Sequence, residues 1–386
     1  MITIFKSFII TFLISYSYAY SHSIEDKGSE HYHNSGIFLT GTDSSNASPD
    51  GPYVFYKGDS IYVRSVAFNG SDLAIEEDIY SDKTNVILTC NVDDRNLFHF
   101  KLMETYVIQP SEYPFPEKIL AVSDIEGNFT AFRLILEGSG VIDKDYNWTF
   151  GKGHLVLVGD FFDRGLNVTE TLWLIYKLEM EAEKAGGKVH FILGNHEIMN
   201  LYGDTRYVRN KYIENAAILD VAYIDLFNED TETGRWLRTK NVAEKIGDIL
   251  FVHGGISIDL AKSGLTLDQI NQTARENIGI KTSLIDSETG KVINSSKTGP
   301  FWYRGLVRGE VSDEEMEQIL NYANAKKIVV GHTLVEEITP FYKNSLVAID
   351  LDHNEDLVQN KLYALWIENG EYFVIDNFGE KKKLFD

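Results

Sequence analysis

Five short blocks of acidic residues, histidine, asparagine and arginine occur along the chain, each directly after an apolar run. The blocks begin at Ser123, Gly159, Gly194, His253 and Gly331. Ionisable side chains at the ends of buried strands cost free energy unless they are paired or bind a metal ion. One such block would be an ordinary structural feature. Five in series, each with glycine that lets the backbone approach a ligand closely, favour one built site.

The residue types in these blocks fit divalent metal ions. Carboxylates and imidazoles together suit Mn, Zn, Fe or Mg, whereas a thiolate site needs several cysteines and the chain has only Cys90. The single cysteine also excludes an internal disulfide framework. Two ions that share a bridging carboxylate acidify a water molecule and hold phosphoryl oxygens. The pattern therefore predicts a two-metal hydrolase of phosphate esters.

The series of blocks resembles the signature of the phosphoprotein-phosphatase-type (calcineurin-like) metallophosphoesterases, usually GDxHG, GDxxDRG, GNHE, HGG and GH. Here it reads SDIEG, GDFFDRG, GNHE, HGG and GH, in the same order, from Asp124 to His332. The segments Gly194 to Val208 and Phe301 to Gly305 are similar to the Shewanella-like branch of bacterial phosphatases. As a set, these motifs are highly specific.

The resemblance implies a role for six metal ligands. A first ion would be held by Asp124, Glu126 and the bridging Asp160. A second ion would be held by Asp160, Asn195, His253 and His332. We expect two divalent ions, with Mn favoured and Fe, Zn or Mg as alternatives.

The resemblance also implies a general acid and a phosphate clamp. His196, oriented by Asp163, would protonate the leaving alkoxide. Arg164 and Arg304 would bind the phosphate oxygens, a task that suits the planar guanidinium group. The alternative for Arg304 is a surface or stacking arginine beside the neighbouring aromatic residues.

Two positions depart from the family pattern. Ser123 replaces the usual glycine, and Glu126 stands where the family normally has histidine. The additional carboxylate lowers the formal charge of the two-metal centre by one. Because a less positive centre acidifies its water less, we expect a first site that favours Mn or Mg over Fe, with a more alkaline pH optimum. The other possibility is that Glu126 does not bind and the site holds one metal.

The elements that must position the blocks read as an α/β fold. Short apolar runs with the length and β-branched content of buried strands are Ile119–Val122, Leu155–Val158, Val189–Leu193, Ile249–Val252, Ile328–Val330 and Leu346–Ile349. Helices are expected at Glu170–Ala185 and Glu314–Ala325, and a hairpin with a type I′ turn at Asn369-Gly370. The resemblance implies a metallophosphoesterase β-sandwich flanked by helices.

The region before these strands divides into three predicted parts. Residues 1–19 read as a signal peptide, 20–35 as a flexible linker, and 36–115 as a β-rich extension or small domain. The β-rich part contains a predicted hairpin from Tyr53 to Val63 and strands at Asn85–Cys90 and Leu97–Leu102. Proline residues from Pro110 to Pro116 mark the boundary with a catalytic domain at 116–386.

Location and partners are predicted from the ends and the charge. The signal peptide implies a periplasmic or secreted protein. One of seven glycosylation sequons, Asn128–Thr130, lies in the predicted active-site loop, where a glycan would block the site. A bacterial source is therefore favoured over a eukaryotic secretory route. The net charge of -22 argues against a nucleic-acid partner. No later segment is long enough to span a membrane. The oligomeric state stays open.

Three functions remain open at this point. The branch resemblance favours a phosphatase of phosphoprotein, acting on Ser/Thr and/or Tyr. The alternatives are a nucleotide or dinucleoside polyphosphate hydrolase and a non-catalytic phosphate-binding module. A small basic run, Arg206, Arg209 and Lys211, would either recruit an acidic or phosphorylated substrate or form a solvated helix face.

Overall fold

The computed structural model describes residues 43, 45–84, 86–93 and 96–385. The predicted signal peptide (1–19) and linker (20–35) lie outside the described residues. Within the described ranges, no helix combines the length and the apolar character needed to cross a membrane.

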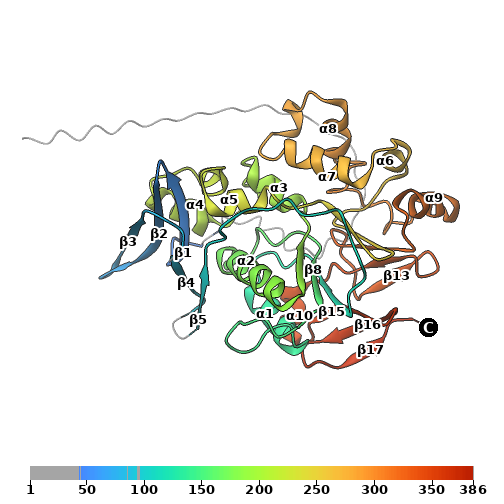
Figure 1. The fold of residues 1–386 in the computed structure, drawn as a ribbon, viewed down its shortest axis with the longest axis horizontal. Coiled ribbons are helices and arrows are strands. Elements are labelled where there is room, and N and C mark those ends of the chain that lie inside the picture. Colours follow the sequence, from blue (N-terminus) through green and yellow to red (C-terminus); the bar gives the residue numbers. More distant parts are fainter. Residues whose placement is uncertain (1–42, 44, 85, 94–95, 386) are drawn as a thin grey trace, which may run out of the picture. The chain divides into compact units, whose positions relative to one another are not determined.

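Two six-stranded sheets form the centre of the fold (Figure 1). The first has the order β17-β16-β15-β7-β8-β9, and the second has the order β13-β14-β12-β11-β10-β6. The strands of the first sheet are β7 (Lys118–Val122), β8 (His154–Leu157), β9 (Lys188–Phe191), β15 (Tyr363–Glu368), β16 (Glu371–Asp376) and β17 (Lys381–Lys383). Those of the second are β6 (Glu112–Tyr113), β10 (Ala243–Ile246), β11 (Ile249–Val252), β12 (Lys327–Val330), β13 (Thr339–Phe341) and β14 (Leu346–Ala348).

Strands β7 to β9 are parallel, and so are β11, β12 and β14. The predicted C-terminal hairpin is β15 and β16, with Asn369 and Gly370 both at positive φ, as a type I′ turn requires.

Apolar residues on both faces of the inner strands explain the uninterrupted apolar runs. In β7, Ile119 and Ala121 belong to the core between the two sheets. Leu120 and Val122 belong to the core that the helices share. A strand buried on both sides has no solvent face, so its sequence does not alternate. The predicted α/β sandwich is confirmed.

Helices cover the outer faces of the sandwich. Helix α2 packs against β9 and contacts α1, and the two helices lie together beside β8 in Figure 1. The α-helices are α1 (Phe129–Gly138), α2 (Val168–Ala185), α3 (Asn195–Leu201), α4 (Asn210–Ile218), α5 (Glu232–Leu237), α6 (Ile258–Lys262), α7 (Leu267–Glu276), α8 (Glu288–Ile293), α9 (Asp313–Ala323) and α10 (His353–Gln359). Two short 3-10 helices are η1 (Tyr223–Phe227) and η2 (Thr282–Leu284).

Further β-structure precedes the sandwich, as predicted. A three-stranded antiparallel sheet contains β1 (Asp50–Lys57), β2 (Ser60–Asn69) and β3 (Asp72–Tyr80), and a hairpin contains β4 (Ile87–Asn91) and β5 (Leu97–Lys101). These strands share a core with the helices, because the Trp173 indole in α2 donates a hydrogen bond of 2.8 Å to the Pro52 carbonyl. From Asp43 onward the chain forms one compact unit, which favours an extension over a separate domain.

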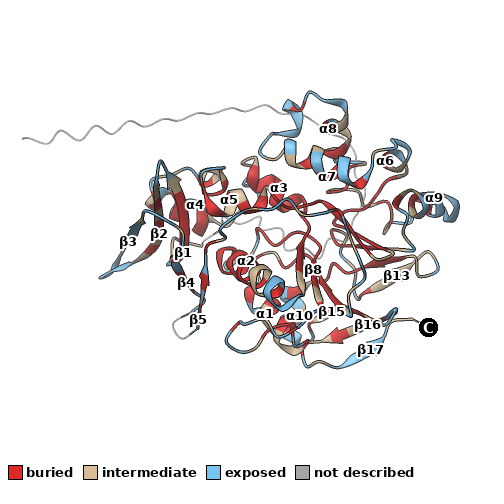
Figure 2. Ribbon diagram, viewed as in Figure 1, coloured by how far each residue is buried: buried red, intermediate tan, exposed pale blue. Residues whose placement is uncertain are grey.

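The buried part of the molecule includes the loops that carry the predicted site. Figure 2 shows most of the strands of both sheets, and much of helices α2 and α3, in the buried colour. The exposed elements are peripheral, including β3 and much of α8 and α9. The site residues are therefore positioned by buried strands and helices.

Candidate metal centre and active site

The five predicted blocks follow the ends of five strands that run in the same sense within their sheets. Blocks from β7, β8 and β9 come from the first sheet, and those from β11 and β12 come from the second. The sheets face each other, so these loops meet at one edge of the sandwich. Hydrogen bonds join them directly: the Asp124 amide donates to the Gly159 carbonyl, and the Gly331 amide donates to the His253 carbonyl.

Six of the ten predicted site residues have a backbone conformation that side chains other than glycine rarely adopt. The six residues with φ between 49° and 71° are Asp124, Glu126, Asp160, Asp163, Arg164 and His332. Each such residue costs free energy, of the order of 1–3 kcal/mol for strained backbone, unless its surroundings hold it there. This concentration of strain is typical of a functional site.

Three glycines leave the space that the site side chains occupy. A Cβ atom at position 194 would lie 2.2 Å from Oδ1 of Asp160. A Cβ atom at position 331 would lie 2.5 Å from Oδ2 of Asp124. At position 159, where φ is also positive, a Cβ atom would lie 2.6 Å from Nδ1 of His253. The glycines in the motifs are therefore required by close approach.

Three acceptor atoms converge in the middle of the site. Nδ1 of His253 is 2.7 Å from the Val158 carbonyl oxygen and must donate to it, which leaves Nε2 as the nitrogen that faces the site. This Nε2 lies 3.0 Å from Oδ2 of Asp160 and 3.1 Å from Oδ1 of Asn195. A proton on Nε2 or a metal ion held by these atoms would relieve the repulsion between an imidazole nitrogen and two oxygens in such proximity.

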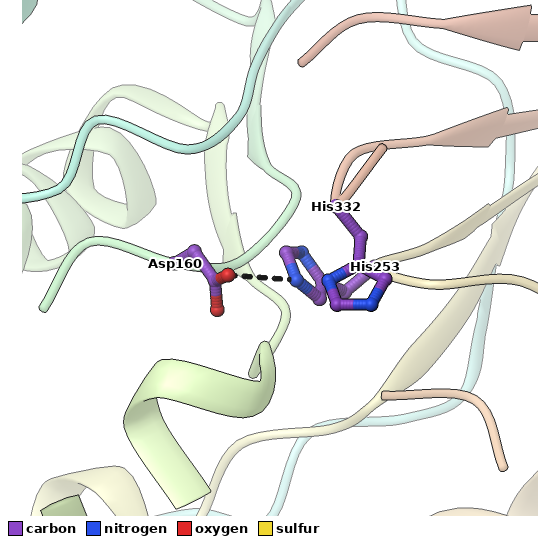
Figure 3. A group of neighbouring side chains, drawn as sticks. All are labelled: Asp160, His253 and His332. Atoms are coloured by element: carbon purple, nitrogen blue, oxygen red, sulfur yellow. Dashed lines mark ion pairs between the residues drawn. The ribbon is translucent and has the colours of Figure 1, made fainter. Parts of the chain in front are cut away.

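His332 completes this group from the other sheet. Figure 3 shows its ring beside that of His253, with Asp160 facing both. Its Nε2 lies 3.0 Å from the Trp302 carbonyl, so Nε2 donates and Nδ1 remains an acceptor. Among the described residues, Asp160, His253 and His332 are the His, Cys or acidic side chains that could hold one metal ion together. Asp124 joins them by accepting the His332 amide at 3.1 Å.

The electrostatics of the group also favour a bound cation. The carboxylates of Asp124 and Asp160 are both buried, which raises the pKa of Asp124. Although burial opposes a charge on its ring, Asp160 raises the pKa of His253 to about 10, so a proton is drawn into the site. A divalent ion would satisfy the same acceptors. The ligand types and the carbonyl bond that orients His253 fit a metal site.

Glu126 is not one of the three side chains that could hold one ion together, and its carboxylate pairs with Arg164. Its Oε1 lies 2.8 Å from Nη1 of Arg164, and its side chain is 13% exposed. Burial raises the pKa of Glu126 to about 8, although Arg164 opposes the shift. A bound ion would compete with Arg164 for the Glu126 carboxylate. The role of Glu126 as a ligand of the first metal stays a prediction.

The predicted general acid and its carboxylate are in contact. Nδ1 of His196 lies 2.6 Å from Oδ2 of Asp163, and Nε2 faces the metal group at 3.8 Å from Oδ2 of Asp160. The other Asp163 oxygen accepts from Nδ2 of Asn200 at 2.9 Å, and the Tyr223 hydroxyl donates to Oδ1 of Asn200 at 2.6 Å. The imidazole is thus fixed with Nε2 toward the metal group. Although burial opposes a charge on the ring, Asp160 and Asp163 raise the pKa of His196 to about 9, so the protonated ring can donate from Nε2. Asn200 and Tyr223, the outer members of this chain of hydrogen bonds, were not predicted.

The two predicted phosphate-binding arginines contact different residues of the site. Arg164 is half exposed and reaches Glu126. Arg304 donates to the His332 carbonyl, and its Nη2 lies 3.4 Å from Nδ1 of His332. Burial lowers the pKa of Arg304. Arg304 is therefore not the surface arginine of the alternative interpretation, because it contacts a candidate metal ligand.

Two further residues hold the site without having been predicted. The Ser123 hydroxyl donates to Oδ2 of Asp124 and lies 2.9 Å from the Val158 carbonyl. The fully buried Glu197 carboxylate accepts from the amides of Gly194, Asp160 and Phe161 at 2.6, 2.9 and 2.7 Å. Glu197 belongs to the GNHE block, and that membership is the signal that would have identified it.

The basic run after the GNHE block does not form a free substrate-binding patch. Helix α4 begins at Asn210, so Arg206 and Arg209 precede it. Arg209 pairs with Asp43 at 3.0 Å, and the buried Lys211 donates to the Leu166 carbonyl at 2.8 Å. Arg206 is exposed but pairs with Asp204 next to it. Both earlier interpretations are therefore wrong for Lys211, which is a structural residue.

Known proteins are similar in sequence to this chain. The profile of the calcineurin-like phosphoesterase family matches residues 117–336. The Shewanella-like protein phosphatase 1 of Plasmodium berghei (strain Anka) is 33% identical over 242 residues, which cover 60% of this chain and 66% of that protein. The Shewanella-like protein phosphatase 2 of Arabidopsis thaliana is 31% identical over 210 residues, which cover 44% and 53%. The chain thus spans about two thirds and about half of these curated relatives.

A solved structure is similar over more of the chain. The crystal structure of the cold-active protein-tyrosine phosphatase of a psychrophile, Shewanella sp., is 34% identical with a TM-score of 0.79. The match covers 88% of this chain and 100% of that one.

Proposed function

Because the chain belongs to the calcineurin-like phosphoesterase family and is therefore a phosphoric ester hydrolase, we propose that it removes phosphate from Ser, Thr or Tyr side chains of proteins. We propose further that two divalent ions assist it, with Mn favoured. One observation carries the proposal: ligand atoms of Asp160, Asn195 and His253 converge beside His196, whose Nδ1 is held by Asp163 and whose Nε2 faces them. Similarity to two Shewanella-like protein phosphatases supports the protein substrate.

The chain's own residues would divide the work. Asp160, Asn195, His253 and His332 would hold one ion, and Asp124 and Glu126 would share Asp160 with the other. When bound, the ions would acidify a water molecule and stabilise the charge on the phosphoryl oxygens. The Val158 carbonyl keeps the acceptor nitrogen of His253 turned toward the ligands.

His196 would supply the proton for the leaving oxygen. Its Nδ1 is occupied by Asp163, so the proton comes from Nε2, on the side of the metal group. Arg304 lies at the same group and would bind a phosphate oxygen. Arg164 would bind another after exchanging Glu126 for the substrate, since a dianionic phosphate offers the same bidentate geometry as a carboxylate.

The first test is hydrolysis of p-nitrophenyl phosphate by the metal-stripped chain resupplied with Mn, Mg, Zn or Fe. Wild type should gain activity and thermal stability with at least one ion, and its bound metal should be counted by elemental analysis. Asp160→Asn should lose both the metal and at least ~10³-fold in kcat. Activity that needs no ion, or that survives Asp160→Asn, would contradict the proposal. Absence of turnover with every ion would support a phosphate-binding module instead.

The proposed role of Glu126 has its own test. If Glu126 binds the first ion, Glu126→His should restore the family's neutral ligand and move the pH optimum toward acid and the metal preference toward Fe or Zn. Bound metal should stay at two ions per chain in both proteins. An unchanged pH profile and an unchanged metal preference would show that Glu126 binds no metal ion and only pairs with Arg164.

A further inference from the structure

Tyr207 is a partly exposed aromatic residue beside the proposed general acid. The centre of its ring lies 5.0 Å from the centre of the His196 ring, and the residue is 38% exposed, whereas His196 is buried. Its carbonyl accepts a hydrogen bond of 3.0 Å from the Arg164 amide. The main chain of Tyr207 is thus tied to the loop that carries Asp163 and Arg164, while its ring faces solvent.

The orientation of His196 determines where the leaving group must lie. Its Nδ1 is held by Asp163, and only Nε2 faces the metal group. The leaving oxygen must therefore sit at Nε2, and the carbon atoms attached to that oxygen must pass the edge of the His196 ring on their way out of the site. The Tyr207 ring lies 5.0 Å from the His196 ring and the residue is partly exposed, so it is available to contact the group that leaves.

The surroundings of Tyr207 suit an aromatic partner. The guanidinium carbons of Arg164 and Arg206 lie 5.5 and 5.8 Å from the centre of its ring. Each arginine is already neutralised by a carboxylate, Glu126 and Asp204 respectively. Tyr207 is still partly exposed, so its ring offers flat apolar area rather than a charge to a substrate. A phenyl ring can stack against it, whereas the short alkyl chain of a serine phosphate covers much less of it.

We propose that Tyr207 is a specificity-determining residue that favours aryl over alkyl leaving groups by stacking against the aromatic ring of the substrate. This inference rests on the proposed function, because it requires His196 to face the leaving oxygen. It would separate phosphotyrosine from phosphoserine through the leaving group rather than through the phosphoryl group.

The test compares two peptides of the same sequence that differ only in phosphotyrosine or phosphoserine. Tyr207→Ala should lower kcat/KM for the phosphotyrosine peptide about three- to tenfold, mainly through KM, because aromatic pairs contribute modestly beyond their area. The value for the phosphoserine peptide should change less than about twofold. Tyr207→Phe keeps the ring and should retain the wild-type preference. Phe68→Ala, which removes an exposed aromatic ring far along the chain in β2, is the matched control and should change neither value.

The outcomes separate the two proposals. An equal loss on both peptides, or a loss in Tyr207→Phe as large as in Tyr207→Ala, would overturn the role of Tyr207 while leaving the phosphatase function intact. A loss confined to the phosphotyrosine peptide, with metal content and melting temperature unchanged, would support it. A wild-type chain that hydrolyses neither peptide nor p-nitrophenyl phosphate with any ion would overturn both.

Discussion

Individual side chains in this site are held by partners that leave one free atom pointing at the metal group. His253 gives its Nδ1 proton to a carbonyl, His332 gives its Nε2 proton to another, and His196 gives its Nδ1 proton to Asp163. In a neutral ring the second nitrogen is then an acceptor, and Nε2 of His196 donates only when that ring is protonated. The chemistry of the site therefore depends on bonds that do not touch the substrate.

The carboxylate behind the general acid should matter most for poor leaving groups. In Asp163→Asn, Nδ2 of Asn200 still donates to the oxygen at Oδ1, so the new amide nitrogen faces Nδ1 of His196 and cannot accept its proton. We expect kcat to fall about 10²-fold for an alkyl phosphate and less than about 10-fold for p-nitrophenyl phosphate, whose leaving group needs no proton. Steady-state rates on the two esters check this. Equal losses would contradict the assignment of His196 as the acid.

Among the elements, helix α3 connects the GNHE block to the loop after β8 through Glu197. Its carboxylate accepts three buried amide protons, from Gly194, Asp160 and Phe161. Glu197→Ala would leave all three without a partner, and an unsatisfied buried donor costs about 1–3 kcal/mol. We expect the free energy of unfolding to fall by about 3 kcal/mol or more.

Denaturant unfolding followed by fluorescence measures this loss. Glu183→Ala in α2, at an exposed position, is the control and should change stability by less than about 0.5 kcal/mol. A Glu197→Ala protein as stable as that control would show that water replaces the carboxylate.

At the start of helix α2, Glu170 should make stability depend on pH. It is buried, Nδ2 of Asn167 donates to its Oε1 at 3.0 Å, and Oε2 has no partner among the described residues. Burial, with Asp50 nearby, raises the pKa of Glu170 to about 7 from an ordinary 4.5. Between these values the folded protein holds a proton that the unfolded chain releases. The free energy of unfolding should therefore fall as pH rises from about 5 to about 7, by up to about 3 kcal/mol.

Glu170→Gln isolates this contribution. The variant cannot ionise at position 170, so the decline of its stability between about pH 5 and about pH 7 should be smaller than that of wild type. Urea unfolding at both pH values gives the difference. Parallel stability curves for the two proteins would mean that Glu170 has an ordinary pKa.

For the whole molecule, the net charge of -22 opposes the approach of a phosphorylated substrate. The arginines and bound ions reverse this field only locally. Raising the ionic strength from about 0.01 to about 0.15 M shortens the screening length from about 30 to about 8 Å. We expect kcat/KM for an acidic phosphopeptide to rise several-fold over this range, and for a basic phosphopeptide to fall. A fall for both peptides would show that the local positive field dominates at long range.

Much of the sandwich was predictable because its inner strands are buried on both faces. This burial requires short uninterrupted apolar runs in the sequence, and every predicted run corresponds to a strand. The short edge strands β6, β13 and β17 carry no such signal, because they contain two or three residues and depend on a neighbour for their pairing. The interpretation of the basic run as a helix face was wrong for Arg206 and Arg209, which precede α4; Arg209 is held by Asp43 and the Arg164 carbonyl.

The residue types at the strand ends determined the chemical class. Carboxylates and imidazoles, together with glycines, at five buried strand ends cost free energy unless they are paired or bind a metal ion. The sequence was also sufficient to name Asp160, Asn195, His253 and His332 as neighbours. The structure alone decided which side chains pair with which. Glu126 forms an ion pair with Arg164, Lys211 forms one with Asp50, and the Tyr207 ring lies beside that of His196. These contacts join residues from different loops, and their formation depends on distances that only the packing of the two sheets and the helices establishes.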